Sequence, residues 1–214
     1  DHTKVLLGVR SMTMRTEEQL IEGIKKGNKE DFSFLIDNYQ LYALKVAYRF
    51  TKDKALAEDV VQESFIKVYR KLNLFEGRSS FKSWFTRILL NTCKNRMRKN
   101  SRESLGLDTP KPSKVQGPEA SMIHLDIGEM LKREIDLLPE KQKQALMLRV
   151  YEDLSFKEVA EVMESPYDTA KANYRHALMK LREKFESCDL LKSWMIESNT
   201  SSGHWLGEIM EVDV

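Results

Sequence analysis

Three polar residues in the segment 57–65 have the types and spacing of a paired-carboxylate site. Asp59, Gln62 and Glu63 stand at positions i, i+3 and i+4, which share one face of an α-helix. Paired carboxylates can act as acid and base or hold a metal ion. However, no His or Cys stands nearby in the sequence and no Gly-rich loop follows, so catalysis is poorly supported. A contact with a basic protein partner fits this face better.

A second segment carries positive charge and no negative charge. Its basic residues are Arg78, Lys82, Arg87, Lys94, Arg96, Arg98, Lys99 and Arg102, and no acidic residue lies among them. The 214-residue chain has a net charge of only +2, so its charge is segregated. On a helix Arg87, Asn91, Lys94 and Arg98 share one stripe. This stripe suits a phosphate backbone, and Asn91 can read a base edge. An ordinary solvated helix face would mix both signs of charge.

The loop 73–80 precedes this basic helix and is short and polar. It carries one aromatic residue, Phe75, whose ring is predicted to stack on an unpaired base. The helix that follows has apolar residues at helical spacing, and these predict its buried face: Phe81, Trp84, Phe85, Ile88, Leu89 and Thr92.

A third pattern, in residues 154–186, predicts a helix-turn-helix. Ser155 with Glu158 forms a capping box that opens a short helix, and Ser165 with Pro166 fits the start of a second one. The second helix carries basic residues, namely Lys171, Arg175, His176, Lys180 and Arg182. Two packed helices with a merely solvated basic face would show the same spacing, so the motif alone is only moderately specific.

The elements that must position these residues are all helical. The predicted fold is all-α, with a four-helix bundle over residues 16–99 and a helix-turn-helix domain over residues 119–186. The bundle helices are expected from Thr16, over 29–50, over 55–72 and over 80–99. Residues 100–118, rich in Pro, Gly and Ser, predict a flexible linker. Residues 1–15 are an extension, native or added, and residues 187–214 are a C-terminal extension.

Several protein classes are disfavoured by the composition. The two cysteines, Cys93 and Cys188, have neither metal-ligand nor disulfide-framework spacing, so no metal or other cofactor is expected. No apolar run approaches the length of a membrane span, and the N-terminus does not resemble a signal peptide. We therefore expect a cytoplasmic protein that does not insert into membranes.

Three strings together resemble one family. They are AEDVVQESFIKVYRKL, LFEGRSSFKSWFTRILLNTCKNRMRK and LPEKQKQALMLRVYEDLSFKEVAEVMESPYDTAKANYRHALMKLREKF. In this order and separation they resemble the extracytoplasmic-function sigma factors of the sigma-70 family. The resemblance covers about residues 17–185. It implies a promoter-specificity subunit of RNA polymerase with no active site of its own, which directs promoter recognition, DNA melting and transcription initiation.

The resemblance also implies roles for individual residues. The bundle corresponds to sigma region 2, whose Asp59, Gln62 and Glu63 match the face that contacts core RNA polymerase. Residues matching the capture of the melted minus-ten strand are Phe75, Arg78, Ser80, Arg87, Asn91, Lys94, Asn95 and Arg98. Unstacking a base costs a few kcal/mol, which pocket contacts offset. The second domain corresponds to region 4, which reads the minus-thirty-five duplex. Arg149 and Thr169 match backbone contacts there, and Lys171, Ala172, Arg175 and His176 match groove-facing positions.

The family also implies an anti-sigma partner, which no residue of the chain reveals. Asp168 and Asn173 depart from the family pattern, which has Gly and Arg at these positions. A carboxylate at 168 repels phosphate, and the loss of an Arg at 173 removes a phosphate contact and weakens salt dependence. Two other interpretations are a DNA-binding regulator that does not engage polymerase and a helical hydrolase using Asp59 and Glu63. The acidic face and the Phe75 loop favour the sigma factor over both.

Overall fold

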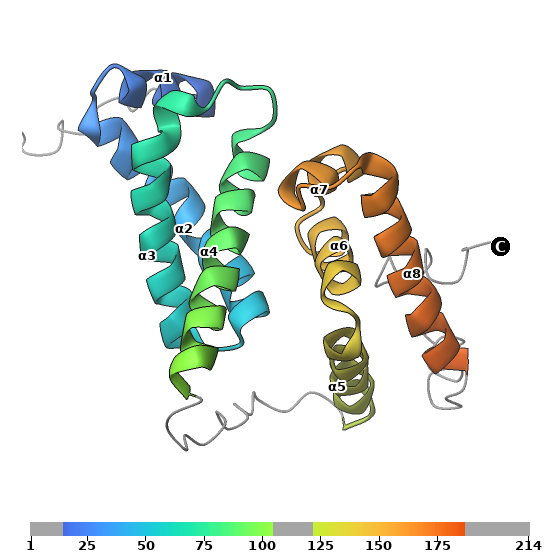
Figure 1. The fold of residues 1–214 in the computed structure, drawn as a ribbon. Coiled ribbons are helices and arrows are strands. Elements are labelled where there is room, and N and C mark those ends of the chain that lie inside the picture. The colour runs from blue at the N-terminus through green and yellow to red at the C-terminus, as the bar shows by residue number, and fades with distance from the viewer. Residues whose placement is uncertain (1–14, 105–121, 187–214) are drawn as a thin grey trace, which may run out of the picture. The chain divides into compact units, whose positions relative to one another are not determined.

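The computed structural model describes residues 15–104 and 122–186, and every regular element in these ranges is a helix (Figure 1). The chain divides into two compact units, residues 1–110 and 111–214. Both observations agree with the predicted two-domain, all-α fold. The predictions made for residues 1–14, 105–121 and 187–214, which include most of the linker and both extensions, lie outside the described residues.

The N-terminal unit contains the predicted bundle helices with nearly the predicted bounds. They are α1 (Glu17–Lys25), α2 (Lys29–Thr51), α3 (Lys54–Lys71), the 3-10 turn η1 (Leu72–Leu74) and α4 (Phe81–Ser104). The capping box of Thr16 and Gln19 is present, which confirms the predicted start of α1. The predicted end of α4 at residue 99 is wrong. Residues 100–104 contain neither Gly nor Pro, so no helix-breaking residue ends the helix within them.

Aromatic side chains fill the core where α2, α3 and α4 meet. Figure 1 shows α3 and α4 side by side, with α2 behind them. The ring of Phe85 in α4 lies 5.1 Å from that of Phe65 in α3 and 5.7 Å from that of Tyr39 in α2, measured between centroids. The predicted buried face of α4 is confirmed except at Ile88, which is only half-buried. This core holds the exposed face of α4 on a rigid support.

Helix α1 is fixed to α2 by a close backbone approach. Gly23 lies directly against the carboxylate of Asp31, so a Cβ at this position would collide with that side chain. Asp31 is buried and forms an ion pair with Arg15. Three apolar residues of α1, namely Leu20, Ile21 and Ile24, are also buried. The end of α1 is therefore held firmly in the bundle.

The second unit contains α5 (Met122–Leu137), α6 (Glu140–Val150), α7 (Phe156–Val162) and α8 (Tyr167–Glu186). The capping box of Ser155 and Glu158 at the start of α7 is confirmed. The prediction that Ser165 caps α8 is wrong, because its hydroxyl is buried and bonds to no group among the described residues. The helix begins one residue after Pro166, and the turn is closed by the backbone N–H of Ser165, which donates to the carbonyl of Ala160 at 2.9 Å.

Two features are absent from the part of the chain that the structure describes. No helix in these ranges combines the length and apolar character needed to cross a bilayer. The same residues contain no group of three or more His, Cys, Asp or Glu side chains arranged to hold a metal ion.

Candidate nucleic-acid interface

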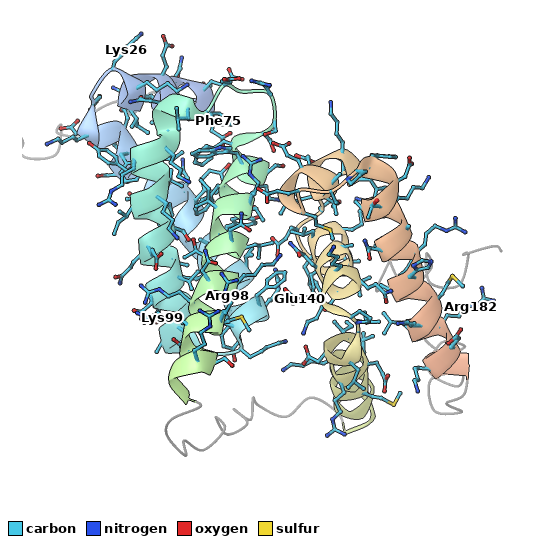
Figure 2. The ribbon with its side chains drawn as sticks, in the orientation of Figure 1. Lys26, Phe75, Arg98, Lys99, Glu140 and Arg182 are labelled. Carbon is cyan, nitrogen blue, oxygen red and sulfur yellow. The ribbon has the colours of Figure 1, made fainter. Side chains whose placement is uncertain are left out.

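The predicted donor stripe lies on the surface of α4. Asn91, Lys94, Asn95 and Arg98 are exposed, and Arg87 is half-buried at the same face. Figure 2 shows Arg98 and Lys99 in the C-terminal half of the helix. One turn of the helix rises about 5.4 Å, so the stripe from Arg87 to Arg98 follows the axis for about three turns. This is a continuous row of donors that can track a strand of nucleic acid.

One hydrogen bond joins the C-terminal end of this stripe to the neighbouring Asn95. Nη2 of Arg98 donates to Oδ1 of Asn95 at 2.8 Å. The amide oxygen of Asn95 accepts from Arg98, and its amide NH₂ can donate to a base or a phosphate. The pair thus presents donors, which match the acceptor-rich edges and backbone of DNA.

Cys93 lies on the inner side of α4, behind the stripe. It is buried, and burial raises the pKa of its thiol to about 12. The side chain therefore packs as a small apolar group at neutral pH.

The loop before α4 differs from its prediction at Phe75. The ring is buried rather than presented for stacking, and it lies 5.2 Å from the Trp84 ring and 5.8 Å from the Phe81 ring. The Trp84 and Phe81 rings provide apolar surface for the Phe75 ring, and the polar loop provides none. The Phe75 side chain therefore packs in the core. Figure 2 shows Phe75 at the end of the bundle where α1 lies. In this conformation Phe75 shapes the loop, and stacking on a base would require the ring to leave the core.

The exposed part of the loop is held by polar contacts. Arg78 forms an ion pair with Glu76, with Nε to Oε2 at 2.5 Å. Ser80 accepts a hydrogen bond from the backbone N–H of Ser83 at 3.2 Å, which caps the first turn of α4. Gly77 has a φ of 73°, a conformation that favours glycine. Arg78 and Ser80, both predicted to bind DNA, are exposed in the C-terminal part of the loop, which we call the mouth of the loop.

Sequence reasoning missed Lys25 as a partner of this loop. Its Nζ donates to the carbonyl of Phe75 at 2.5 Å and lies 5.8 Å from the centroid of the Phe75 ring. The two residues are 50 positions apart, and no local pattern in the sequence links them.

The predicted acidic face of α3 is divided by the structure. Asp59 and Gln62 are exposed, whereas Glu63 bridges α3 and α4. Glu63 pairs with Lys67 at 2.7 Å and with Nε of Arg96 at 2.5 Å. The hydrogen bond from Lys67, together with that from Arg96, holds the pKa of Glu63 below its usual range despite the opposing effect of burial. Glu63 therefore acts as a link inside the bundle.

An apolar groove of about 780 Å³ lies beside this face, between α2 and α3. Gln62 lies at its edge, and Phe32, Ile36, Ile66 and Tyr69 line it. Ile66 and Tyr69 are about half exposed, which is unusual for apolar side chains on the same helix as a buried core. The groove and the two exposed polar residues together form a surface suited to a protein partner.

The helix-turn-helix places its predicted residues in two groups. Thr169, Lys171, Arg175 and His176 are exposed on α8, and Ala172 is half-buried. The opposite side of α8 is buried, and it is formed by Ala170, Tyr174, Ala177, Leu178 and Leu181. The exposed face of α8 does not pack in the core of this unit, and its basic side chains suit a recognition helix.

Arg149 and Asn173 have more restricted surroundings. Arg149 lies 5.5 Å from the Phe156 ring and donates to the carbonyl of Leu154 and to Asp153, both at 3.4 Å. Asn173 donates from its amide to the carbonyl of Thr169 at 2.9 Å, within α8. The side chain that replaces the expected Arg therefore bonds to its own helix.

Comparison with protein families and solved structures identifies both units. The family model described as sigma-70 region 2 matches residues 35–103, and the one described as sigma-70, region 4 matches residues 128–181. The RNA polymerase sigma-H factor of Pseudomonas aeruginosa is 34% identical over 172 residues, covering 75% of this chain and 89% of the relative. The ECF RNA polymerase sigma-E factor of Haemophilus influenzae is 31% identical over 182 residues, covering 80% and 96%.

Two solved structures are similar in fold. The sigma factor RpoE of Bartonella quintana, determined in complex with the anti-sigma factor NepR, is 25% identical with a TM-score of 0.60. The match covers 74% of this chain and 98% of that one. CnrH, determined with the cytosolic domain of CnrY, has a TM-score of 0.56 at 18% identity, covering 85% and 97%, and supports the fold alone.

Proposed function

The chain belongs to the extracytoplasmic-function sigma factors of the sigma-70 family, and on that basis we propose how its two domains divide promoter recognition. Sigma factors are non-catalytic initiation factors, so no reaction is assigned to Asp59 or Glu63. Region 2, residues 16–104, captures the melted minus-ten strand. Region 4, residues 119–186, reads the minus-thirty-five element as duplex. The exposed donor stripe on α4, beside a short polar loop, is the observation that carries this proposal.

Within region 2, Asn91, Asn95 and Arg98 read or hold the single strand, and Lys94 and Arg87 neutralise its phosphates. The hydrogen bond between Arg98 and Asn95 supports this assignment because it leaves the Asn95 amide group as a donor. The mouth of the loop, with Arg78 and Ser80, receives an unpaired base. Phe75 is buried in the core and fixes the N-terminal end of that loop.

Within region 4, α8 enters the major groove. Lys171, Arg175 and His176 are exposed side chains in its N-terminal half, and recognition helices contact base edges with that half. Thr169 contacts the DNA backbone, and Ala172 offers a small apolar surface. Arg149 is held against Phe156, which limits it to a backbone contact at the side of the helix.

Core RNA polymerase docks on the exposed face of α3 and its groove. Asp59 and Gln62 supply polar contacts and the groove supplies apolar area. Glu63 supports this surface by joining α3 to α4 rather than by a contact of its own. An anti-sigma factor is the expected regulator, since the similar RpoE was determined with one. Because polymerase is the working partner, we place the protein in the cytoplasm.

Run-off transcription on a promoter library, with purified core polymerase, tests this function. The wild type should start RNA at defined sites, and Asn91→Ala should lower the yield about tenfold through weaker minus-ten capture. Asn38→Ala, at an exposed position of α2, is the matched control and should leave the yield unchanged. A wild-type protein that binds DNA but never supports initiation would contradict the proposal.

A further inference from the structure

The base-receiving loop is fixed at both of its ends. At the C-terminal end, Ser80 caps α4 through the backbone N–H of Ser83. At the N-terminal end, Phe75 is held by three contacts. Its backbone N–H donates to the carbonyl of Leu72 at 3.0 Å, and its ring packs in the core. Its carbonyl accepts a hydrogen bond from Lys25. Only residues 76–79 lie between these anchors.

Lys25 differs from the other anchors because it comes from a separate element. It is the last residue of α1, and a cation at a helix C-terminus is favoured by the helix dipole. Its helix is held by buried apolar residues and by the Gly23–Asp31 contact. Its ammonium can therefore impose a fixed position on the Phe75 carbonyl rather than follow the movement of the loop.

We propose that Lys25 is a positioning residue for promoter melting: by holding the Phe75 carbonyl, it keeps the loop 76–80 in the conformation that receives the unpaired base. This proposal rests on the proposed role of the loop in region 2. Lys25 contacts the loop backbone and the Phe75 ring, and it acts on DNA through them. A loop that is ordered before binding loses less conformational entropy when the base enters.

The alternative is a direct contact between Lys25 and a DNA phosphate. The two roles differ in salt dependence, because each phosphate contact contributes about 0.7 to the slope of log affinity against log salt for a single strand. A positioning residue changes affinity and leaves that slope unaltered.

The test uses full-length protein in holoenzyme with core polymerase. The variants are Lys25→Met, which keeps the aliphatic stem and removes the donor, and Lys25→Arg, which keeps a cationic donor. The neighbouring Lys26→Met is the matched control, since Lys26 is exposed and its ammonium pairs with Glu22, one turn earlier on the surface of α1. The probe is a single strand carrying the minus-ten element found by run-off transcription, with 2-aminopurine in place of the base that the loop receives.

Lys25→Met should weaken binding of the single-stranded probe about three- to tenfold, the range expected for the loss of one ordinary intramolecular hydrogen bond. The 2-aminopurine signal should fall in parallel. Lys25→Arg should restore both, Lys26→Met should match the wild type, and affinity for the minus-thirty-five duplex should be unchanged in all four proteins. Thermal unfolding checks that the variants are folded.

Three results would overturn the inference. The first is a probe affinity of Lys25→Met equal to that of the wild type. The second is a loss of affinity in Lys26→Met as large as in Lys25→Met. The third is a salt slope of Lys25→Met that is shallower by about 0.7. If the wild-type holoenzyme itself gave no 2-aminopurine signal, the proposed role of the loop would fail and the inference with it. A normal wild-type signal that Lys25→Met retains would remove only the inference.

Discussion

Glu63 shows what the structure adds to a residue singled out by its type and spacing in the sequence. Its position beside Asp59 and Gln62 predicts a contact with another protein, and in the structure its carboxylate also holds Lys67 and Arg96. The ion pair with Arg96 joins α3, where we propose that polymerase docks, to α4, where we propose that DNA binds. A substitution here therefore alters the bundle before it alters any interface.

We expect Glu63→Gln to lower the free energy of unfolding by about 1 kcal/mol, since two partly exposed charge-assisted hydrogen bonds are weakened. Urea denaturation of the full chain measures this change. Glu58→Gln, on the exposed side of the same helix, should have an effect within about 0.5 kcal/mol of zero. Equal losses in both variants would show that the bridge is not the cause.

The same carboxylate makes stability depend on pH in a defined direction. The pKa of Glu63 is lower in the folded chain than in the unfolded chain, so at mildly acidic pH the unfolded state binds more protons. The stabilisation is complete above the unfolded pKa and is lost as the pH falls through the folded pKa. Denaturation midpoints measured from neutral to acidic pH should fall less steeply for Glu63→Gln than for the wild type.

Asn173 allows a gain of function to be tested at one residue. Its amide bonds to the carbonyl of Thr169 in α8, so it offers little to a phosphate. Asn173→Arg should strengthen binding to minus-thirty-five duplex several-fold and steepen the salt slope by about 0.9. Titrations at several salt concentrations measure both. Asn173→Gln is the control and should leave the salt slope unchanged. An unchanged slope for Asn173→Arg as well would show that position 173 does not face the DNA backbone.

At the scale of elements, the turn between α7 and α8 contains a strained residue. Glu164 has a φ of 50°, in the left-handed region that non-glycine residues adopt at a cost of about 1 kcal/mol. Glu164→Gly should therefore stabilise region 4 by about 0.5 kcal/mol, after the larger entropy of glycine in the unfolded chain is subtracted.

Differential scanning calorimetry of the full chain can detect this change as a higher unfolding temperature. Glu161→Gly, three residues earlier and inside α7, is the matched control and should destabilise by about 1 kcal/mol, as glycine does in a helix. If both variants destabilise alike, the backbone at 164 is not strained.

The sequence predicts the elements well where a helix start has a local chemical signature. The capping boxes at Thr16 and Ser155 are contained within four residues, and both are confirmed. The contacts that the sequence does not predict join residues that are far apart along the chain. Phe75 lies in a polar loop but is buried by Phe81 and Trp84, and the bridges of Lys25 and Glu63 join residues 50 and 33 positions apart. No spacing rule within one element reports such contacts.

For the whole molecule, two recognition surfaces on separate units should contribute independently to promoter binding. We propose that Asn91 acts on the minus-ten element and Arg175 on the minus-thirty-five element. In holoenzyme on a complete promoter, the free-energy losses of Asn91→Ala and Arg175→Ala should therefore add within about 0.5 kcal/mol. Asn95→Ala with Arg98→Ala is the contrasting pair, because these residues share a hydrogen bond and should not be additive. Strong coupling between Asn91 and Arg175 would contradict independent surfaces.

The burial of Cys93 makes its rate of alkylation a measure of how often α4 leaves the bundle. With a thiol pKa of about 12 and no access to solvent, Cys93 is alkylated by iodoacetamide only when the helix leaves the bundle. In a Cys188→Ser background, the alkylation rate therefore measures how often region 2 opens. Repeating the measurement with polymerase, DNA or an anti-sigma factor bound would show which partner closes the bundle most tightly, without any attached probe.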